Sequence, residues 1–183
     1  SDETLIFSRS HPNSSRWYSN REVAFSWRND DATEYQYLFN TTPTSSVDTG
    51  TYTTDQQVTL TAPDDGIYYL HLQARSNDGV DIGEVVSYRV QIDTAPPATP
   101  ALLVSTNEPS INEIVRFDFS SSDDGSGLQE RYFYFSFDDG LLLPVQSPFS
   151  TAFQAVGNYT VKVRAFDNAQ NYTDAKIEIR VRD

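Results

Sequence analysis

The two histidines of the chain are its candidates for acid–base chemistry. Nucleophilic catalysis needs a Ser or Cys beside such a base, and the Gly-x-Ser-x-Gly elbow that often presents the Ser does not occur in this sequence. His11 lies in a loop that contains a proline, and His71 alternates outward with Tyr69 and Gln73 along a predicted strand. We expect both rings to pack at the surface or under a loop, and we predict that the chain is not an enzyme.

Aspartates gather in predicted turns, where their carboxylates could bind calcium. This ion takes roughly six to eight oxygen ligands from carboxylates, amides and main-chain carbonyls. The candidate metal ligands are Asp93, Asp123, Asp124 and Asp167, and Asp93 could meet a loop of the second domain. The alternative is turn chemistry, because Asp, Asn and Gly are common in turns and tolerate left-handed backbone. No EF-hand register is present, so calcium is possible and not required.

Aromatic side chains offer a second possible binding chemistry. Residues 131–137, RYFYFSF, are predicted to form a strand with aromatic side chains on both faces. One face must join a core, and the other is either covered by a loop or neighbouring chain or exposed for stacking on sugar rings or a protein. The loop after Pro12 poses the same choice between packing and exposure. The candidate ligand-binding residues are Tyr132, Tyr134, Trp17 and Tyr18, and the opposite face of the predicted strand carries Phe133, Phe135 and Phe137.

Strands must position these residues, and one strand pattern occurs twice. GIYYLHLQARSNDG begins at Gly66, and GNYTVKVRAFDNAQN begins at Gly157. Both alternate strictly between apolar and other residues, which indicates a strand with one buried face. The Tyr after each Gly is placed as in a tyrosine corner, whose hydroxyl bonds to nearby main chain. The predicted core positions are Tyr68, Leu70, Leu72 and Ala74 in the first copy and Tyr159, Val161, Val163 and Ala165 in the second.

The repeat predicts two domains within the 183 residues, each long enough to build its own core. No segment shows a sustained helical period, so we predict an all-β chain of two tandem antiparallel β-sandwiches. The first should span residues 1–93 and the second residues 101–183, with a Pro-rich linker at 94–100. The sequence DTAPPATP, which starts at Asp93, holds three prolines. Prolines fix φ and favour an extended path, so we expect a semi-rigid joint between the domains.

Composition excludes several classes of partner. The net charge is -13, without a basic stripe, so nucleic acid is not an expected partner. No apolar run approaches the roughly 20 residues of a membrane helix. Cysteine is absent, so neither disulfides nor thiolate metal sites can form. Methionine is absent too, even at the first position, and we therefore expect the chain to be part of a longer protein.

The motifs resemble those of two kinds of β-sandwich. The first domain resembles fibronectin type III in Trp27 on its second strand, Leu60, Pro63, Gly66 and Tyr68. The second resembles the Ig-like and polycystic-kidney-disease-type repeats of large bacterial and archaeal surface proteins, through DDGSGL, FDDG and GNYTVKVRAFDNAQN. It departs from them at Gln170, where such repeats usually have Gly in a DNAGN turn.

The resemblance implies spacing, display or adhesion, and it names no ligand. We predict a secreted or cell-surface module that acts as a stiff spacer and as an adhesion or interaction segment of a larger protein. Its partners would be proteins or glycans at the cell surface, and the segment itself would be monomeric. The alternative is an accessory carbohydrate-binding module of a secreted enzyme, which predicts a planar row of exposed aromatic rings.

Overall fold

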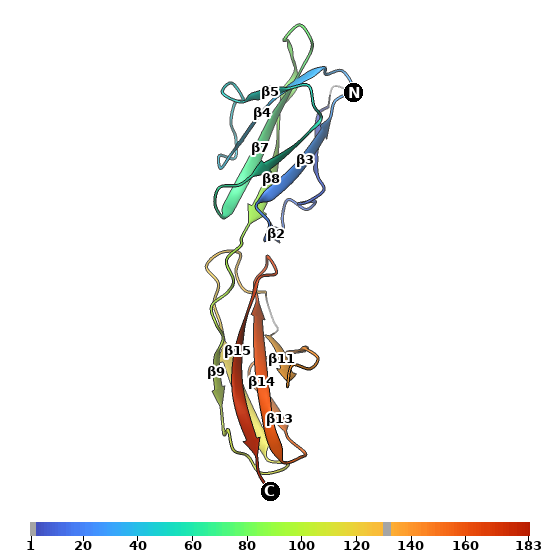
Figure 1. The fold of residues 1–183 in the computed structure, drawn as a ribbon. Coiled ribbons are helices and arrows are strands. Elements are labelled where there is room, and N and C mark those ends of the chain that lie inside the picture. The colour runs from blue at the N-terminus through green and yellow to red at the C-terminus, as the bar shows by residue number, and fades with distance from the viewer. Residues whose placement is uncertain (1–2, 130–132) are drawn as a thin grey trace. The chain divides into compact units, whose positions relative to one another are not determined.

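A computed structural model of the chain describes residues 3–129 and 133–183. It divides into two compact units, Ser1–Thr94 and Ala95–Asp183 (Figure 1). Each unit consists of two β-sheets, which confirms the predicted all-β fold. Among the described residues, none belongs to a helix long and apolar enough to cross a membrane.

The first unit holds strands β1 to β8. One sheet has the order β1-β3-β6 and the other the order β2-β8-β7-β4-β5. The short pair of β2 and β8 is parallel, and the other pairs of these two sheets are antiparallel. The bounds are Leu5–Ser8 for β1, Trp17–Tyr18 for β2, Glu22–Arg28 for β3, Glu34–Asn40 for β4, Thr51–Thr53 for β5, Gln57–Thr61 for β6, Gly66–Arg75 for β7 and Asp81–Ile92 for β8.

The first core lies between these two sheets. Alternation along β3 buries Val23, Phe25 and Trp27 and turns the residues between them outward, as the sequence predicts. The facing strand β7 contributes its four predicted positions, all of them buried. A buried Leu replaced by Ala would cost about 2 to 5 kcal/mol of stability, because the rigid surroundings leave a cavity.

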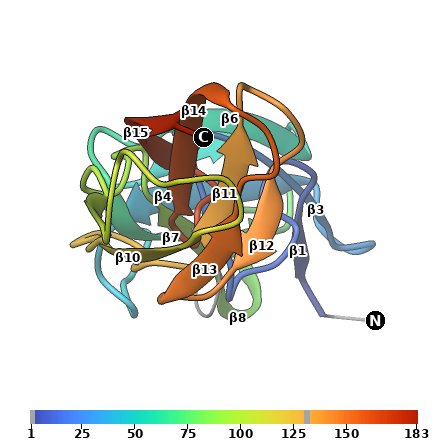
Figure 2. The same ribbon diagram turned by 90° about the horizontal axis from the view of Figure 1, so that it is seen from below.

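The second unit holds strands β9 to β15 in two antiparallel sheets, ordered β13-β10-β9 and β12-β11-β14-β15. The edge strand β12 lies beside β11 (Figure 2). The bounds are Ala101–Val104 for β9, Ile114–Ser120 for β10, Phe133–Phe137 for β11, Leu143–Val145 for β12, Phe149–Ala152 for β13, Gly157–Phe166 for β14 and Tyr172–Val181 for β15.

Aromatic rings fill much of the second core. Phe135 is buried, and its ring contacts that of Phe117 at 5.2 Å between centroids, in the edge-to-face geometry that aromatic pairs favour. Phe133 and Phe137 pack against the same cluster, so of the two aromatic faces predicted for this strand the phenylalanine face joins the core. Of the predicted positions on β14, Val161, Val163 and Ala165 are buried and Tyr159 is partly buried.

Both predicted tyrosine corners form. In the first unit the hydroxyl of Tyr68 accepts a hydrogen bond from the main-chain N–H of Asp64 at 3.3 Å. In the second unit the hydroxyl of Tyr159 donates to the carbonyl of Ala155 at 3.0 Å. Each hydrogen bond joins a tyrosine hydroxyl to the main chain four residues earlier. It therefore attaches the turn that precedes a central strand to the first tyrosine of that strand. The two copies of the repeat therefore begin with the same local structure.

Candidate functional site

A group of aromatic rings and one arginine crosses the outer face of the second unit. Tyr134 comes from β11, Arg164 and Phe166 from β14, and Tyr172 from β15. The cross-strand register explains why they meet, because Tyr134 lies opposite Arg164 and Phe166 lies opposite Tyr172. All four alternate with core positions and so point away from the core. We call these four residues the aromatic–arginine surface.

Arg164 is the centre of this surface. Its guanidinium lies 3.7 Å from the centroid of the Tyr172 ring, within the range of a cation–π contact. It also donates two hydrogen bonds to the carboxylate of Asp174, Nε to Oδ1 at 2.7 Å and Nη2 to Oδ2 at 3.0 Å. These bonds lower the pKa of Asp174 and raise that of Arg164. The arginine is thus held by Asp174 over the ring of Tyr172, a residue that is 50% exposed.

The rings of this surface are not coplanar. Tyr134 meets Phe166 edge to face, with 5.2 Å between centroids and an interplanar angle of 82°. Phe166 and Tyr172 are tilted by 57°. A sugar chain stacks on ring faces that lie in one plane, whereas tyrosine and arginine side by side are typical of protein contacts. Among the described residues this surface therefore fits a protein better than a flat polysaccharide.

Sequence reasoning found one member of the surface and missed three. Tyr134 was a candidate, and Tyr132, its predicted neighbour, lies outside the described residues. Phe166, Arg164 and Tyr172 were not singled out, although Phe166 and Tyr172 flank the DNAQN turn. If the two strands that flank the turn are assumed to pair as a β-hairpin, Phe166 and Tyr172 lie opposite each other, as they do in the structure.

The other two candidate aromatics lie in the loop of the first unit. The hydroxyl of Tyr18 accepts a hydrogen bond from the N–H of Asn13 at 3.0 Å, and its ring lies 4.7 Å from that of His11. Trp17 pairs with Gln91 in the short parallel bridge of β2 and β8. Both residues are half-buried, and the loop is fastened by the side chain of Tyr18 and by the main chain of Trp17. A role for them in ligand binding stays a prediction.

The two histidines are buried under loops. The Nδ1 atom of His11 is bonded to the hydroxyl of Ser10 at 2.8 Å, and Nε2 to the carbonyl of Asn20 at 2.9 Å. His71 is on the outer side of β7, as predicted, but its exposed fraction is 0% because the chain after β4 covers it. Its Nε2 atom lies 2.9 Å from the carbonyl of Thr42. Burial lowers the pKa of both rings, so they are neutral at physiological pH.

Of the four candidate metal ligands, two lie close together within the second unit. Carboxylate oxygens of Asp123 and Asp167 are within 4.8 Å of one another. Asp167 is buried and also closes its own turn, since its Oδ1 accepts the N–H groups of Ala169 and Asn171 at 2.8 and 2.9 Å. Asp124 is exposed. The N–H of Asp93 donates to the carbonyl of Tyr18 within the first unit.

The chain on each side of the boundary between the units is bonded to its own unit. Thr94 donates to Asp65 from its main-chain N–H and from its hydroxyl. The next residue, Ala95, accepts a hydrogen bond from the side chain of Asn171 at 3.2 Å. Further along the predicted linker, the carbonyl of Pro97 accepts from Thr173 at 2.6 Å. Residues 95–97 are therefore attached to the second unit rather than suspended between the two.

Comparisons with known proteins identify the fold. No family model matches the chain, and no curated protein matches it. Among solved structures, the fibronectin(III)-like modules of CbhA from Clostridium thermocellum share 16% identity, cover 97% of this chain and 94% of theirs, and give a TM-score of 0.56. Murine CEACAM1b shares 11% identity over 98% of this chain and 100% of its own, with a TM-score of 0.52. The chain thus has the tandem fold of fibronectin III-like and Ig-like modules.

Proposed function

We propose that the chain is a non-catalytic extracellular spacer, a two-module segment that holds other parts of a larger protein apart. The observation that carries this proposal is the anchoring at the boundary of the units, where Thr94 is bonded to Asp65 and Ala95 to Asn171. A flexible linker between two β-sandwiches would absorb bending, whereas anchored residues leave few rotatable bonds free. The two nearby prolines, Pro96 and Pro97, reduce that freedom further.

Double electron–electron resonance, which measures the distance between two spin labels, tests the spacer role. The chain has no cysteine, so spin labels can be placed at Thr44→Cys in the first unit and Gln154→Cys in the second, both exposed positions. We expect a narrow distance distribution. Asp65→Ala, which releases Thr94, should broaden it, and Asp48→Ala, an exposed position of the same unit, should not. A broad distribution in the unaltered chain would contradict the proposal.

The aromatic–arginine surface supports a second role, adhesion to a protein partner. Tyrosine and arginine dominate the energetics of many protein interfaces, and Arg164 is already held by Asp174, so little entropy is lost when it is covered. A photo-crosslinking amino acid at Tyr172 should capture a protein from the cell surface. The same group at Val80, an exposed position of the first unit, should capture none. Equal capture at both positions would remove this role.

Calcium binding by the acidic turns of the second unit is the remaining proposal. The proximity of Asp123 and Asp167 supports it, since a cation between the two carboxylates would offset their mutual repulsion. Such an ion would stiffen the turn between β14 and β15. Participation of Asp124 belongs to the same proposal, and its test is given in the Discussion. The role of Asp93 as a metal ligand stays a prediction from the sequence.

A further inference from the structure

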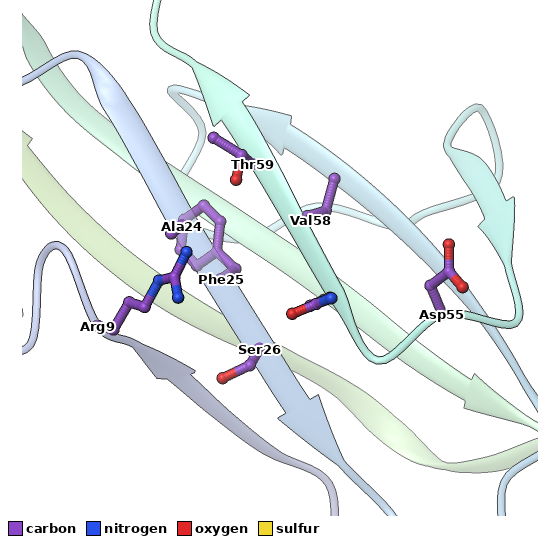
Figure 3. Close-up of a pocket in the computed structure, with 8 residues that line it drawn as sticks. Arg9, Ala24, Phe25, Ser26, Asp55, Val58 and Thr59 are labelled. Carbon is purple, nitrogen blue, oxygen red and sulfur yellow. The ribbon is translucent and has the colours of Figure 1, made fainter.

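A polar hollow lies on the outer face of the small sheet of the first unit. It measures about 610 Å³ and opens over β3 and β6, with the chain after β1 along one side (Figure 3). This volume lies within the range of small-molecule sites. We call it the β3 groove; its polar and small lining residues are Arg9, Ala24, Ser26, Asp55, Gln57 and Thr59.

Small side chains on the central strand form the floor of the groove. Ala24 and Ser26 point outward from β3, between the longer side chains of β1 and β6. The first strand also ends at Ser8, so no strand covers Ala24 on that side. Instead, the Ala24 N–H donates to the hydroxyl of Ser10 at 2.8 Å, and its carbonyl accepts from Ser8 at 2.9 Å. The departure of the chain after β1 thus opens the groove without leaving main-chain groups unpaired.

The polar side chains around the groove have no partner within the described part of the protein. Arg9 forms no ion pair there, whereas Arg21 and Arg28 of the same unit each bond a carboxylate. Figure 3 shows Arg9 reaching over Ala24 from one side and Asp55 standing at the other. The carboxylate of Asp55 and the amide of Gln57 are also without intramolecular hydrogen bonds, and both residues are exposed. The donors and acceptors of the groove are therefore available to a ligand.

An exposed aromatic ring borders this polar floor. Phe7 of β1 lies directly opposite Ser26, on the same face of the sheet, and its side chain is 52% exposed. On the other side of Ser26 the register places Gln57, and Thr59 lies opposite Ala24. One side of the face thus offers an apolar ring and the other side an amide and a hydroxyl.

We propose that the β3 groove binds a neutral oligosaccharide. Sugar hydroxyls both donate and accept hydrogen bonds. The groove offers them donors from the guanidinium of Arg9, acceptors from the carboxylate of Asp55, and both kinds of group from an amide and hydroxyls. The C–H face of a sugar ring can pack on Phe7. Arg9 and Asp55 cancel in charge, and the net charge of -13 repels anions, so a charged glycan is disfavoured. The site is independent of the spacer role, which could hold or fail without it.

Nuclear magnetic resonance titration of the whole chain tests the site. Cellotetraose, xylotetraose and mannotetraose, each at millimolar concentration, are the probes, and triglycine is the peptide control. We expect at least one sugar to shift the main-chain amides of Ala24, Ser26 and Thr59 in a saturable way. The double variant Asp55→Ala with Gln57→Ala should weaken that binding by about tenfold, since two hydrogen-bonding groups are lost. Gln154→Ala, in the second unit, should leave it unchanged.

Three results would overturn the proposal. The groove amides could fail to shift with all three sugars. The double variant could bind as tightly as the unaltered chain, with tryptophan fluorescence confirming that it is folded. Triglycine could shift the same amides while no sugar does, which would assign the groove to a peptide. None of these results bears on the distance measurement, so the spacer role would be judged separately.

Discussion

Thr94 is bonded to Asp65 twice, by its main-chain N–H to Oδ2 and by its hydroxyl to Oδ1, each at 2.9 Å. Arg21 adds a third contact, from Nε to Oδ1 at 3.1 Å. Burial alone would raise the pKa of Asp65, but these hydrogen bonds outweigh it and the pKa lies below its ordinary value. One carboxylate therefore holds the last residue of the first unit.

Asp65→Ala should destabilise the first unit by about 1 to 3 kcal/mol, because a carboxylate with several hydrogen bonds is removed. Both tryptophans, Trp17 and Trp27, lie in this unit, so urea unfolding followed by their fluorescence reports on it alone. Asp48→Ala, also in the first unit, is the matched control and should leave the midpoint unchanged. A variant at Asp65 with an unaltered midpoint would show that the carboxylate does not hold Thr94.

Protonation of the same carboxylate should lower the stability of the first unit at acid pH. Its lowered folded pKa means that the stabilisation is complete above the ordinary pKa of about 3.9 and is lost as the pH falls through the folded value. Asp65→Asn should flatten this part of the profile, because the amide does not titrate. The measurement is the fluorescence-detected midpoint as a function of pH below about 5. A fall in stability of the same depth in the variant would assign it to other carboxylates.

The buried histidines predict a second dependence on pH, nearer to neutrality. Burial lowers the pKa of His11 and His71 in the folded chain, so the unfolded chain binds more protons as the pH falls below about 6.5. The first unit should be most stable above that pH and should weaken below it. His71→Gln, whose amide can replace one of the ring's hydrogen bonds, should reduce the slope. A midpoint that is constant between about pH 7.5 and 5.5 would contradict this expectation.

Gln170 predicts a stabilising substitution. It occupies the DNAQN turn with φ at 71°, in the left-handed region that glycine enters without steric cost. Gln170→Gly should therefore stabilise the second unit by about 0.5 to 1 kcal/mol, despite the greater freedom of glycine in the unfolded chain. Calorimetry measures this as a higher melting temperature of the second unit, whose transition tryptophan fluorescence does not report because both tryptophans lie in the first unit. The opposite sign would mean that the Gln170 side chain contributes contacts beyond its backbone conformation.

Calcium should raise the melting temperature of the second unit if the ion binds at Asp123 and Asp167. A concentration about 100 times the dissociation constant would stabilise by about 2.7 kcal/mol, which corresponds to several degrees. Calorimetry with EDTA and with millimolar calcium measures the shift. Asp123→Asn should abolish the shift in melting temperature. Asp124→Asn tests whether the exposed candidate also binds the ion. Asp48→Asn in the first unit is the control and should leave the shift unchanged. Without a shift, these aspartates serve turn structure and solubility only.

Local patterns predicted the strands and cores well. Alternation identified the buried faces of β3, β7 and β14, and a Tyr two positions after a Gly identified both tyrosine corners. These features depend on neighbours in the chain, because a strand exposes alternate residues to one face whatever lies beyond it. The same rule put Phe133, Phe135 and Phe137 on one face of their strand, and the structure decided that this face joins the core.

The sites depended on contacts that alternation does not encode. His71 was correctly placed on the outer side of its strand, yet it is buried because residues near Thr42 fold over that side. The β3 groove exists because the chain leaves Ala24 after Ser8, and its lining comes from three separate segments.

The sequence by itself determined an acidic, cysteine-free, all-β chain of two sandwiches, because composition and a period of two are local properties. Only the tertiary structure decided that the guanidinium of Arg164 lies over the Tyr172 ring and that Arg9 and Asp55 line one groove. Register between strands and the path of loops set those distances, and both result from packing over the whole unit. Apart from Tyr134, the residues that could bind a partner are therefore ones that the sequence pattern did not bring together.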